Sequence, residues 1–572
     1  MNAAYVALAA LVLLALGYRF YGRFLARHVY RTETGDEEPT PAEVYNDGTD
    51  YVPTPRGIVF GHHFSSIAGA APILGPAVAV VWGWLPALLW VVLGTIFMGA
   101  VHDYGALIIS VKHKGQSIGA VTEKIIGARS RMLFLTVIFL LVFIVIAVFA
   151  YIIANLFILY PGSVIPINFE IIIAIIIGYW THYRKKNLLL PSLVALLLLY
   201  FMIYVGFEYP VRLPEYLWLF GSEIMSWILF LMIYGFIAAV LPVWVLLQPR
   251  DYINSHQLIA GLALIYAAIF ISGPQMDAPA INSGPVDMQW FPFLFITIAC
   301  GAISGFHSLV ASGTTSKQLA KVKDARLVGY GGMTGEATLA VAATIAVAAG
   351  FSGSEAWHHH YENFSYASGL QGSLQAFVEG TASFLSAIGI NQTMTDGQGA
   401  QQSLAAVFVS VIVISFAATS LDTAVRIQRY IIGEIGEAVN GRKFFQNRYV
   451  VTAVAVGLSF LLVITDGSGR GGLRLWPLFG STNQMVGSLA LLVISVWLFR
   501  LGRNMWFTLL PMIIITLITF IATVANFLHY LDEQNQLLVF LAFVIGICQI
   551  WIIVEGIRIF FDRSPDTEQD IL

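Results

Sequence analysis

Long apolar segments alternate with short polar ones along the whole chain, and this pattern predicts membrane-spanning helices. A helix needs about 20 apolar residues to cross the hydrocarbon core of a bilayer. Fifteen windows of this kind can be drawn, at 3–24, 58–81, 85–111, 132–159, 163–182, 188–208, 226–247, 256–273, 291–313, 330–350, 402–425, 449–465, 475–499, 505–528 and 536–561. We therefore expect an all-α polytopic membrane protein with about 15 transmembrane helices.

The composition excludes a soluble domain. Hydrophobic residues make up 58% of the 572 positions and charged residues only 11%, whereas an ordinary soluble domain has about 25% charged residues. A membrane β-barrel is excluded as well, because its strands alternate in polarity and give no long apolar runs. The two cysteines, Cys300 and Cys548, both lie in apolar runs, so no disulfide framework is expected.

The basic residues predict the orientation of the chain. The apolar run of the first window has no basic residue before it and is followed by Arg19, Arg23, Arg27 and Arg31, which predicts an outside N-terminus and argues against a cleaved signal peptide. If successive connecting loops lie on alternate sides of the membrane, only three of the 30 basic residues fall on the outer face: Arg212, Arg470 and Arg474. Positive charge accumulates on the cytoplasmic side of membrane proteins, so the C-terminus is predicted inside.

The window at 58–81 has the character of an interrupted helix. Its first part, FGHHFSSIAGAAPILGP from Phe60 to Pro76, holds paired histidines, paired serines, glycines and the prolines Pro72 and Pro76. Backbone that is left open inside a membrane persists only where protein or a water-filled cavity covers it. A packing face of small residues is the alternative, but two prolines four positions apart favour a broken helix that lines a solute site.

Two later windows also contain small, polar or helix-breaking residues. The window 226–247 contains Gly235 and Pro242, and we predict a second interrupted helix there. The window 291–313, with CGAISGFHSLVASGT, repeats the mixture of small and polar residues seen in the first interrupted segment.

Ionisable side chains inside the windows are candidates for function, because each costs several kcal/mol to bury in a bilayer. They are His62, His63, His102, Asp103, His307, Glu336 and Asp422. A structural network that ties helices together near the cytoplasmic side is the alternative, and for Asp103 the two interpretations are balanced. His62, His63 and His307 lie beside Gly and Ser, which favours function. Asp422 and Arg426 are four positions apart and are predicted to form a structural ion pair.

Five sequence blocks together are similar to one family. They are GHHFSSIAGAAPILGP, GAVHDYGALIISVKHKGQSIG, ACGAISGFHSLVASGTTSK, SLDTAVRIQRYIIGE and LWPLFGSTNQM, in this order from about Gly57 to Gln484. They resemble the signature blocks of the carbon starvation protein A (CstA) family, although GYGGMTGEA around Glu336 has smaller residues than the family pattern. The resemblance implies a secondary transporter of the bacterial inner membrane for peptides or for pyruvate.

The resemblance also implies a LeuT-type fold with two inverted five-helix repeats. On this basis we expect a first transmembrane helix and a cytoplasmic loop at 1–57, repeats at 58–208 and 226–425, a long external loop at 351–401, and additional helices at 449–572. A cation site in such a fold would use oxygen atoms of Ser65, Ser66, Ala68, Gly69, Ser304 and Ser308.

The substrate and coupling residues implied in this way are His62, His63, Ser65, Ser66, Gly69, Asp103, His307 and Glu336. An anionic substrate would be held by the amides of a broken helix, assisted by a protonated histidine. A peptide would also need an acceptor for its ammonium group, such as Asp103 or Glu336. The coupling cation is a proton, carried by a histidine, or sodium, and no other cofactor is expected.

The leading hypothesis is thus a cation-coupled symporter for small peptides or monocarboxylates, and not an enzyme. A subunit of a proton-pumping enzyme is less favoured, because no lysine lies in mid-span and no haem, flavin or iron–sulfur pattern is present. A solute-binding sensor, a facilitator or a channel would share the same pocket and stays open as an alternative.

The partners expected are therefore a small solute, the lipid bilayer and a second copy of the chain through the last two windows. Nucleic acid is not expected, because the positive-inside rule accounts for the basic residues. His358, His359 and His360 could bind a metal, but adjacent residues point in different directions, and we expect an exposed loop there.

Overall fold

The structure, a computed structural model, describes residues 1–33, 39–184, 187–282, 289–362, 367–395, 401–438, 445, 447–465 and 467–561. The first half of the chain forms α1 (Ala3–Leu16), α2 (Pro41–Val44), α3 (Arg56–Ile67), α4 (Ala71–Ala79), α5 (Trp84–Gly94), α6 (Ala100–Lys112), α7 (Ile118–Ile125), α8 (Ala128–Leu159), α9 (Val164–Arg184), α10 (Leu189–Glu208), α11 (Glu223–Val240) and α12 (Leu247–Ser272). The second half forms α13 (Trp290–Thr297), α14 (Gly305–Gly313), α15 (Gly331–Ala349), α16 (Ser354–Glu362), α18 (Leu370–Ala387), β1 (Thr393–Thr395), β2 (Gln401–Ser403), α19 (Leu404–Ala438), α20 (Arg448–Ile464), α21 (Phe479–Arg500), α22 (Trp506–Asp532) and α23 (Gln536–Phe561).

Short turns of tighter or wider helix extend several of these helices. They are η1 (Gly17–Gly22), η2 (Leu25–Val29), η3 (Val80–Trp82), η4 (Thr95–Gly99), η5 (Pro161–Ser163), η6 (Glu215–Leu217), η7 (Thr315–Lys317), η8 (Val322–Asp324), η9 (Arg326–Tyr330) and η11 (Gly471–Leu478).

The polytopic helical class is confirmed, but the count of fifteen is not. Twelve helices of the described chain are long and apolar enough to cross a membrane, and the bent pair of α3 and α4 would raise the number to thirteen. The two other predicted windows differ from single long spans. The window 291–313 forms two short helices, α13 and α14, and the window 449–465 forms α20, an apolar helix of only 17 residues.

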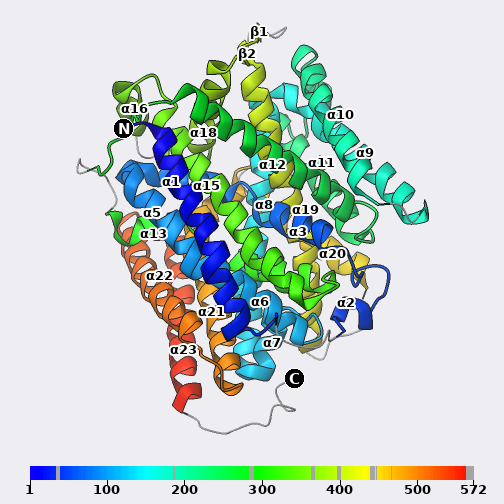
Figure 1. Cartoon of the computed structure of the whole chain (residues 1–572), viewed down its shortest axis with the longest axis vertical. Helices are drawn as coiled ribbons and strands as arrows, with labels where there is room; N and C mark the ends of the chain where they lie inside the picture. The colour runs from blue at the N-terminus through cyan, green and yellow to red at the C-terminus, as the bar shows by residue number, and fades with distance from the viewer. Residues whose placement is uncertain are drawn as a thin grey trace.

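The helices form one bundle around α8, α19 and α21. Figure 1 shows α9 and α10 along one side and α22 and α23 along the opposite side, with the N-terminus at the upper end and α23 descending to the lower end. In the most apolar stretch of α19, 89% of the residues are buried. The share is 94% in the span formed by η11 and α21, and only 28% in α23. The last helix is therefore peripheral, and α8 and α19 pack along each other in the centre.

The first predicted interruption is confirmed, and the second lies elsewhere. α3 and α4 meet at a bend of 46° between Ile67 and Ala71. The prediction for 226–247 is wrong, because α11 is continuous to Val240 and Pro242 lies just beyond its end. The second interruption is in 291–313, where α13 ends at Thr297 and α14 begins at Gly305.

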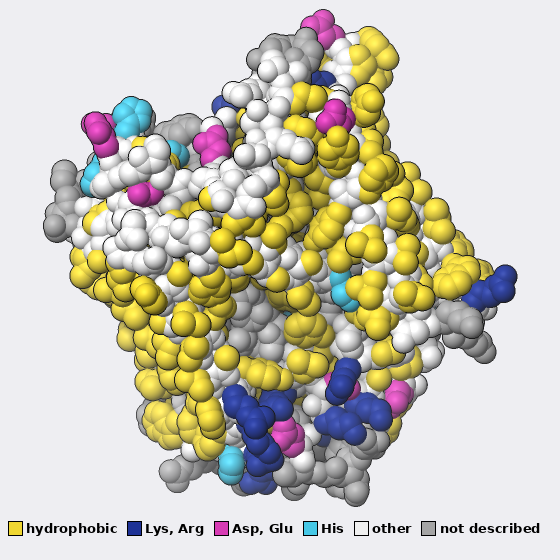
Figure 2. All heavy atoms as spheres, turned by 45° about the horizontal axis from the view of Figure 1, so that its top comes forward, with side chains coloured by type: hydrophobic (Ala, Val, Ile, Leu, Met, Phe, Trp, Pro, Cys, Tyr) yellow, Lys and Arg dark blue, Asp and Glu magenta, His cyan; other side chains and the backbone are white. Residues whose placement is uncertain are grey.

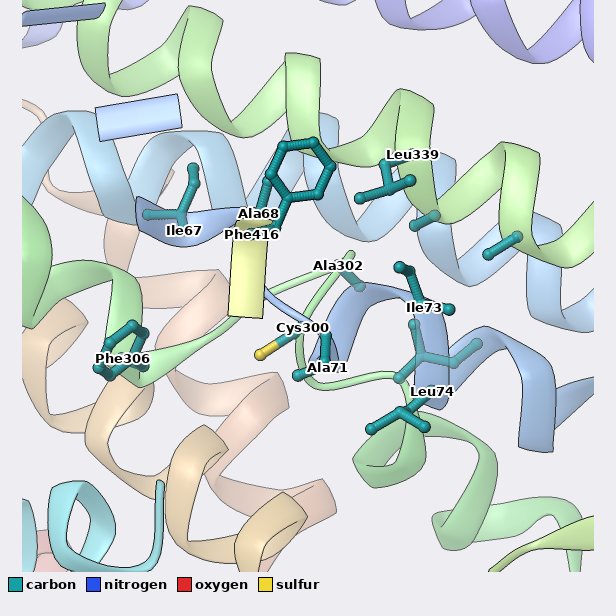
Figure 3. Packing of buried hydrophobic residues seen from close by; sticks show 14 of the residues in the cluster. Ile67, Ala68, Ala71, Ile73, Leu74, Cys300, Ala302, Phe306, Leu339 and Phe416 are labelled. Carbon is teal, nitrogen blue, oxygen red and sulfur yellow. The ribbon is translucent and has the colours of Figure 1, made fainter. Parts of the chain in front are cut away.

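The two interruptions lie against each other in the interior of the bundle. A Cβ atom at Gly75 would come within 2.5 Å of the Thr297 carbonyl oxygen, and one at Gly301 within 3.7 Å of Pro72 Cα. Gly301 also has a φ of +92°, a conformation that side chains with a Cβ rarely adopt. Figure 3 shows Ala71 and Leu74 beside the irregular segment that carries Cys300 and Ala302. Small residues therefore permit the close approach of two open backbone segments.

One end of the bundle is basic. We define the basic end by Arg27, Arg131, Lys317, Arg326, Arg429 and Arg503, which lie where helices end or begin. In Figure 2 most of the Lys and Arg side chains of the visible face gather at the lower end, below a broad hydrophobic surface. The opposite end, where α1 begins, is called the far end below.

A segment that we call the strap, residues 45–55, closes over the helices at the basic end. Its backbone pairs with the residues that follow α14: Val52 N donates to Lys317 O at 3.1 Å, and Thr54 N donates to Gln318 O at 3.0 Å. Thr49 O accepts from Val243 N at 3.0 Å. The strap thus joins the residues that follow α14 to the connection between α11 and α12.

Asp50 anchors the strap to α19. Its carboxylate accepts from Arg426 Nη1 at 2.7 Å and from Arg429 Nη2 at 2.9 Å. Burial alone would raise the pKa of Asp50, but these guanidinium groups outweigh it and hold the pKa well below its usual range. Lys317 is also close by: its ammonium lies 3.6 Å from the centre of the Tyr430 ring, and burial lowers its pKa to about 8.

The long segment 351–401 is structured at the far end. The segment contains the helix α18, and β1 pairs antiparallel with β2. The three adjacent histidines, His358–His360, lie in the short helix α16 and not in an open loop. Among the described residues, no group of three His, Cys, Asp or Glu side chains is arranged to hold a metal ion.

The contact between the interruptions leads to a stability prediction. Gly75→Ala would push a methyl group into the Thr297 carbonyl, and overpacking of this kind costs about 1–3 kcal/mol. Gly457→Ala in α20 is the matched control, because nothing lies within 4 Å of the added methyl group. We expect a lower thermal midpoint for Gly75→Ala in detergent, measured by intrinsic fluorescence. Equal midpoints for both variants would contradict the close packing of α4 on α13.

Candidate transport site

The first interruption exposes its backbone to hydroxyl groups of α19. Ser420 Oγ donates to the Ser66 carbonyl oxygen at 2.9 Å, and Ser66 Oγ lies 3.1 Å from Thr423 Oγ1. A Cβ atom at Gly69 would lie 2.6 Å from Ser420 Oγ and 2.9 Å from the Phe149 ring. α19 and α8 therefore cover the break in the first interrupted helix.

Side chains of three other helices satisfy the second interruption. Trp90 Nε1 donates to Ile298 O at 3.3 Å, and Thr95 Oγ1 donates to Gly301 O at 3.0 Å. Asn483 of α21 accepts from Phe306 N at 2.9 Å and so caps the first turn of α14. The break is therefore held open by specific hydrogen bonds from α5, η4 and α21.

A chain of buried ionisable side chains lies next to the second interruption. His102 Nδ1 is 2.8 Å from Asp103 Oδ1, Asp103 Oδ2 is 3.0 Å from His307 Nδ1, and His307 Nε2 is 3.5 Å from Glu336 Oε2. All four side chains are fully buried. We call this set, contributed by α6, α14 and α15, the histidine–carboxylate chain. Its alternating acids and bases can hold a proton and pass it between neighbours.

His62 belongs to a different cluster. Its Nδ1 lies 2.5 Å from Asp251 Oδ2, and its Nε2 lies 2.9 Å from Thr314 Oγ1. The neighbouring His63 points to Thr315, with Nδ1 at 3.0 Å from Oγ1. His62 therefore links α3 to α12 and α14, while His63 links α3 to η7.

The serines that were predicted to share a cation have hydrogen bonds to other groups in this structure. Ser65 Oγ donates to Asp251 O at 2.9 Å, and Ser308 Oγ donates within its own helix to Gly305 O at 2.7 Å. Ser304 Oγ is bonded to Asn483. The hydroxyls beside Ser66 and Gly69 come instead from Ser420 and Thr423 of α19. Ala68 forms the C-terminal end of α3.

The predicted ion pair between Asp422 and Arg426 is wrong. Asp422 Oδ2 accepts from Arg250 Nη1 at 2.5 Å and also from the Tyr234 hydroxyl. Arg426 instead binds Asp50 of the strap. Although the two side chains are one helical turn apart, each has a partner on another element.

Arg250 also binds a second carboxylate. Its Nε lies 3.1 Å from Glu170 Oε1, and Glu170 Oε2 accepts from Ser415 Oγ at 2.8 Å. Arg250 therefore joins α9, α11, α12 and α19 in the interior.

A cavity of about 530 Å³ opens near the far end, above the two interruptions. Its walls come from α4, α13, α21 and α22, and they include Gly75 and Thr297, where the interrupted helices touch. Aromatic and polar side chains share the lining: Trp82, Phe293, Trp476, Phe479, Asn526, His529, Tyr530 and Glu533. The cavity is thus large enough for a small solute and reaches the region where the backbone is open.

Asp251, Ser420, Thr423 and Asn483 were not predicted as site residues. Ser420 and Thr423 lie three positions apart on α19 and hence on one helical face, and this spacing is a signal that could have identified them. Asp251 gave no comparable signal, since it follows Arg250 in the polar stretch QPRDY.

Comparison with known proteins places the chain among transporters. The family described as "Carbon starvation protein CstA" matches residues 2–357 and 355–522. "Peptide transporter CstA" of Helicobacter pylori is 34% identical over 91% of this chain and 81% of its own length. "Peptide transporter CstA" of Escherichia coli is 32% identical, over 89% of this chain and 79% of the relative. "Pyruvate/proton symporter BtsT" of Escherichia coli is also 32% identical, over 89% and 80%.

A solved structure shows a similar fold. The crystal structure of a mutant of the Eremococcus coleocola manganese transporter aligns with 90% of this chain and 99% of its own, with a TM-score of 0.52 and 13% identity. This likeness concerns the fold alone. The family match over most of the chain and the identity to its relatives show that the protein belongs to the carbon starvation protein CstA family.

Proposed function

We propose that this protein is a secondary active transporter that takes up small peptides or monocarboxylates such as pyruvate by cation-coupled alternating access. The observation that carries the proposal is the meeting of two interrupted helices beside the fully buried histidine–carboxylate chain. Open backbone in a membrane interior is tolerated where it lines a solute path. The names of its relatives agree with uptake of a peptide or of pyruvate, and we do not assign the chain an enzymatic activity.

The substrate is recognised between the far-end cavity and the interruptions. An anionic group would meet the N-terminal end of α14, beside the Asn483 cap, and His307 lies in its first turn. A peptide ammonium group would be received by a carboxylate such as Glu336. His62, His63, Ser65, Ser66 and Gly69 line the other interrupted helix.

The coupling cation is a proton in this proposal. The histidine–carboxylate chain alternates groups that bind protons, and Glu336 has its ion-pair partner only at 3.5 Å. A proton that moves between Glu336 and His307 changes the charge beside α14, so protonation and substrate binding affect each other. Sodium, bound by oxygens of the first interruption and of α19, is the alternative coupling ion.

The orientation follows from the basic end. We assign this end to the cytoplasm of a bacterial inner membrane by the positive-inside rule, which puts the N-terminus outside and the C-terminus inside. The strap then closes the cytoplasmic side, while the far-end cavity opens outward. Alternating access requires Asp50 to release Arg426 and Arg429. The exposed apolar faces of α22 and α23 suit lipid or a second copy of the chain.

The interrupted helices also suggest how the inverted repeats are arranged. A second repeat that begins with α13 gives α3–α4, α5–α6, α8, α9 and α10 in the first repeat and α13–α14, α15, α19, α20 and α21 in the second. In this register equivalent helices make equivalent contacts. The second half of each interrupted helix packs on the next helix of the other repeat: α4 on α15, and α14 on α6. The short helix before the third helix of each repeat packs on that helix: α7 on α8, and α18 on α19. The arrangement revises the boundary at 226, which depended on an interruption in α11, and makes α11 and α12 an inserted pair.

Uptake into proteoliposomes tests the function. We expect labelled pyruvate or a labelled dipeptide to accumulate inside vesicles that contain the purified protein when a proton gradient is imposed. Accumulation driven only by sodium would replace the proton as the coupling ion. Saturable binding without accumulation under either gradient would favour the alternative, a solute sensor or an uncoupled facilitator.

Two substitutions test the site. His62→Ala removes a buried hydrogen-bonded partner of Asp251, and Asp103→Asn removes the proton-binding partner of His102 and His307. Hydrogen bonds of this kind contribute about 1.5–3 kcal/mol, so uptake should fall about tenfold or more. Membrane insertion, measured by yield and size-exclusion profile, should be unchanged. His358→Ala in the exposed part of α16 is the control. Normal uptake with an unchanged pH dependence in both variants would show that the pocket lies elsewhere.

Asp50→Asn tests the strap as the cytoplasmic closure. The loss of two ion pairs should raise the fraction of molecules open at the basic end, and Cys300, buried at the second interruption, reports this opening. In a Cys548→Ser background we expect labelling of Cys300 by a maleimide from the basic end to become about tenfold faster. Asp324→Asn in η8, at the same end, is the control. Equal labelling rates in the two variants would contradict the closure.

A further inference from the structure

A group of buried charges between α9, α12 and α19 lies outside the histidine–carboxylate chain. Glu170, Arg250, Asp251 and Asp422 are each at most 1% exposed. The group therefore combines three carboxylates with one guanidinium. If every carboxylate were ionised, it would carry two uncompensated negative charges in a low-dielectric interior, which is costly.

The neighbouring groups can compensate at most one of these two negative charges. His62 of α3 binds Asp251 at 2.5 Å and can hold one proton. Tyr234 of α11 donates a neutral hydroxyl to Asp422. Arg426 of α19 is engaged elsewhere, because its Nη1 binds Asp50 and its Nη2 donates to Ala238 O at 2.9 Å. One further positive charge is needed among these side chains.

Unpaired oxygen atoms mark where that charge can lie. Asp251 and Asn254 share one face of α12, Thr419 and Asp422 share one face of α19, and Asn254 Nδ2 donates to Thr419 Oγ1 at 2.7 Å. This bond holds the two faces together. Along the described chain, Asp251 Oδ1, Asn254 Oδ1 and Asp422 Oδ1 are buried without a hydrogen-bond partner. We call this contact the α12–α19 seam.

We propose that the α12–α19 seam binds a proton of its own, on Asp251 or Asp422, and exchanges it during transport. The inference rests on the proposed function and adds a second proton site to it. A proton on one carboxyl group fits these surroundings in two ways. It donates a hydrogen bond to one of the three unpaired oxygen atoms, and it supplies the missing positive charge. No cluster of ligands for a divalent metal is found in the described ranges.

The link to transport runs through α3. His62 is held by Asp251 on one side and by Thr314 of the interrupted helix α14 on the other, and Ser66 at the first interruption lies 3.4 Å from His62 Nδ1. Any tilt of α3 changes the distance between His62 and Asp251. When His62 withdraws, the seam loses a partner and its affinity for a proton rises, so movement of the interrupted helix and protonation of the seam are coupled.

The number of protons per substrate tests the proposal. It is measured from the membrane potential that stops net uptake in proteoliposomes at fixed gradients. Asp251→Asn and Asp422→Asn each mimic the protonated carboxyl, so both variants should transport with a ratio that is lower by one proton than that of the wild type. Glu379→Gln on α18, an exposed acid outside the seam, is the matched control and should keep the wild-type ratio.

The other outcomes are distinct. A wild-type ratio in both seam variants would show that the seam holds a permanent proton, which overturns the inference and leaves the proposed function in place. A sodium requirement that is lost in Asp422→Asn would make the seam a sodium site and also overturn it. Absence of any proton-driven uptake by the wild type would overturn the proposed coupling and this inference together.

A second measurement needs no seam variant. Infrared difference spectra of the wild-type protein, recorded when a transported substrate is added, report carboxyl groups that change protonation. We expect a carboxyl band in addition to those of the histidine–carboxylate chain, identified by its persistence in the double variant Asp103→Asn/Glu336→Gln. If the double variant still binds the substrate and shows no carboxyl band, the seam does not exchange a proton.

Discussion

Every polar group in the centre of this protein must find its partner within the chain or in bound solvent, because lipid offers none. This constraint explains the two interruptions. Where the helical ladder stops, Ser420 covers the Ser66 carbonyl, Trp90 the Ile298 carbonyl and Thr95 the Gly301 carbonyl. The same constraint gathers the buried charges into groups, in which each acid lies beside a histidine or an arginine.

Much of the fold could be predicted from local pattern, because a long apolar run in a membrane has few structures open to it. The twelve long spans and the first interruption follow from such runs and from Pro72 and Pro76. The second interruption was assigned to the wrong helix for a physical reason. Pro242 ends α11 and does not break it, and one sequence does not distinguish a helix end from a gap that a neighbouring helix fills. In 291–313 it is Asn483, 177 positions from Phe306, that caps the new helix.

The candidate site was predictable only in part. The residues of the histidine–carboxylate chain were all identified as ionisable groups inside apolar windows, but their pairing was not. Asp422 and Arg426 satisfy a helical spacing, yet Arg250 and Asp50 displace that pairing through contacts across the bundle. Asp251 was missed because the apolar window begins at residue 256, whereas α12 begins at Leu247 and carries its polar first turns into the interior. The burial of the charged first turns of α12 depends on the helices that cover them, and the local sequence does not show those contacts.

The pair α11–α12 has a consequence for the energy of the transport cycle. In the proposed repeat register, exchanging the conformations of two repeats of identical sequence, with nothing else present, would interconvert an outward-open and an inward-open state of equal free energy. α12 packs along α3, whereas α13, the equivalent of α3 in the second repeat, is packed by α22, the first helix of the last pair. Because the two pairs pack differently, the two states of the proposed transporter differ in free energy. The transporter without substrate then has a preferred resting state. Unequal rates for influx and efflux are then built into the architecture, independently of the ion that drives transport.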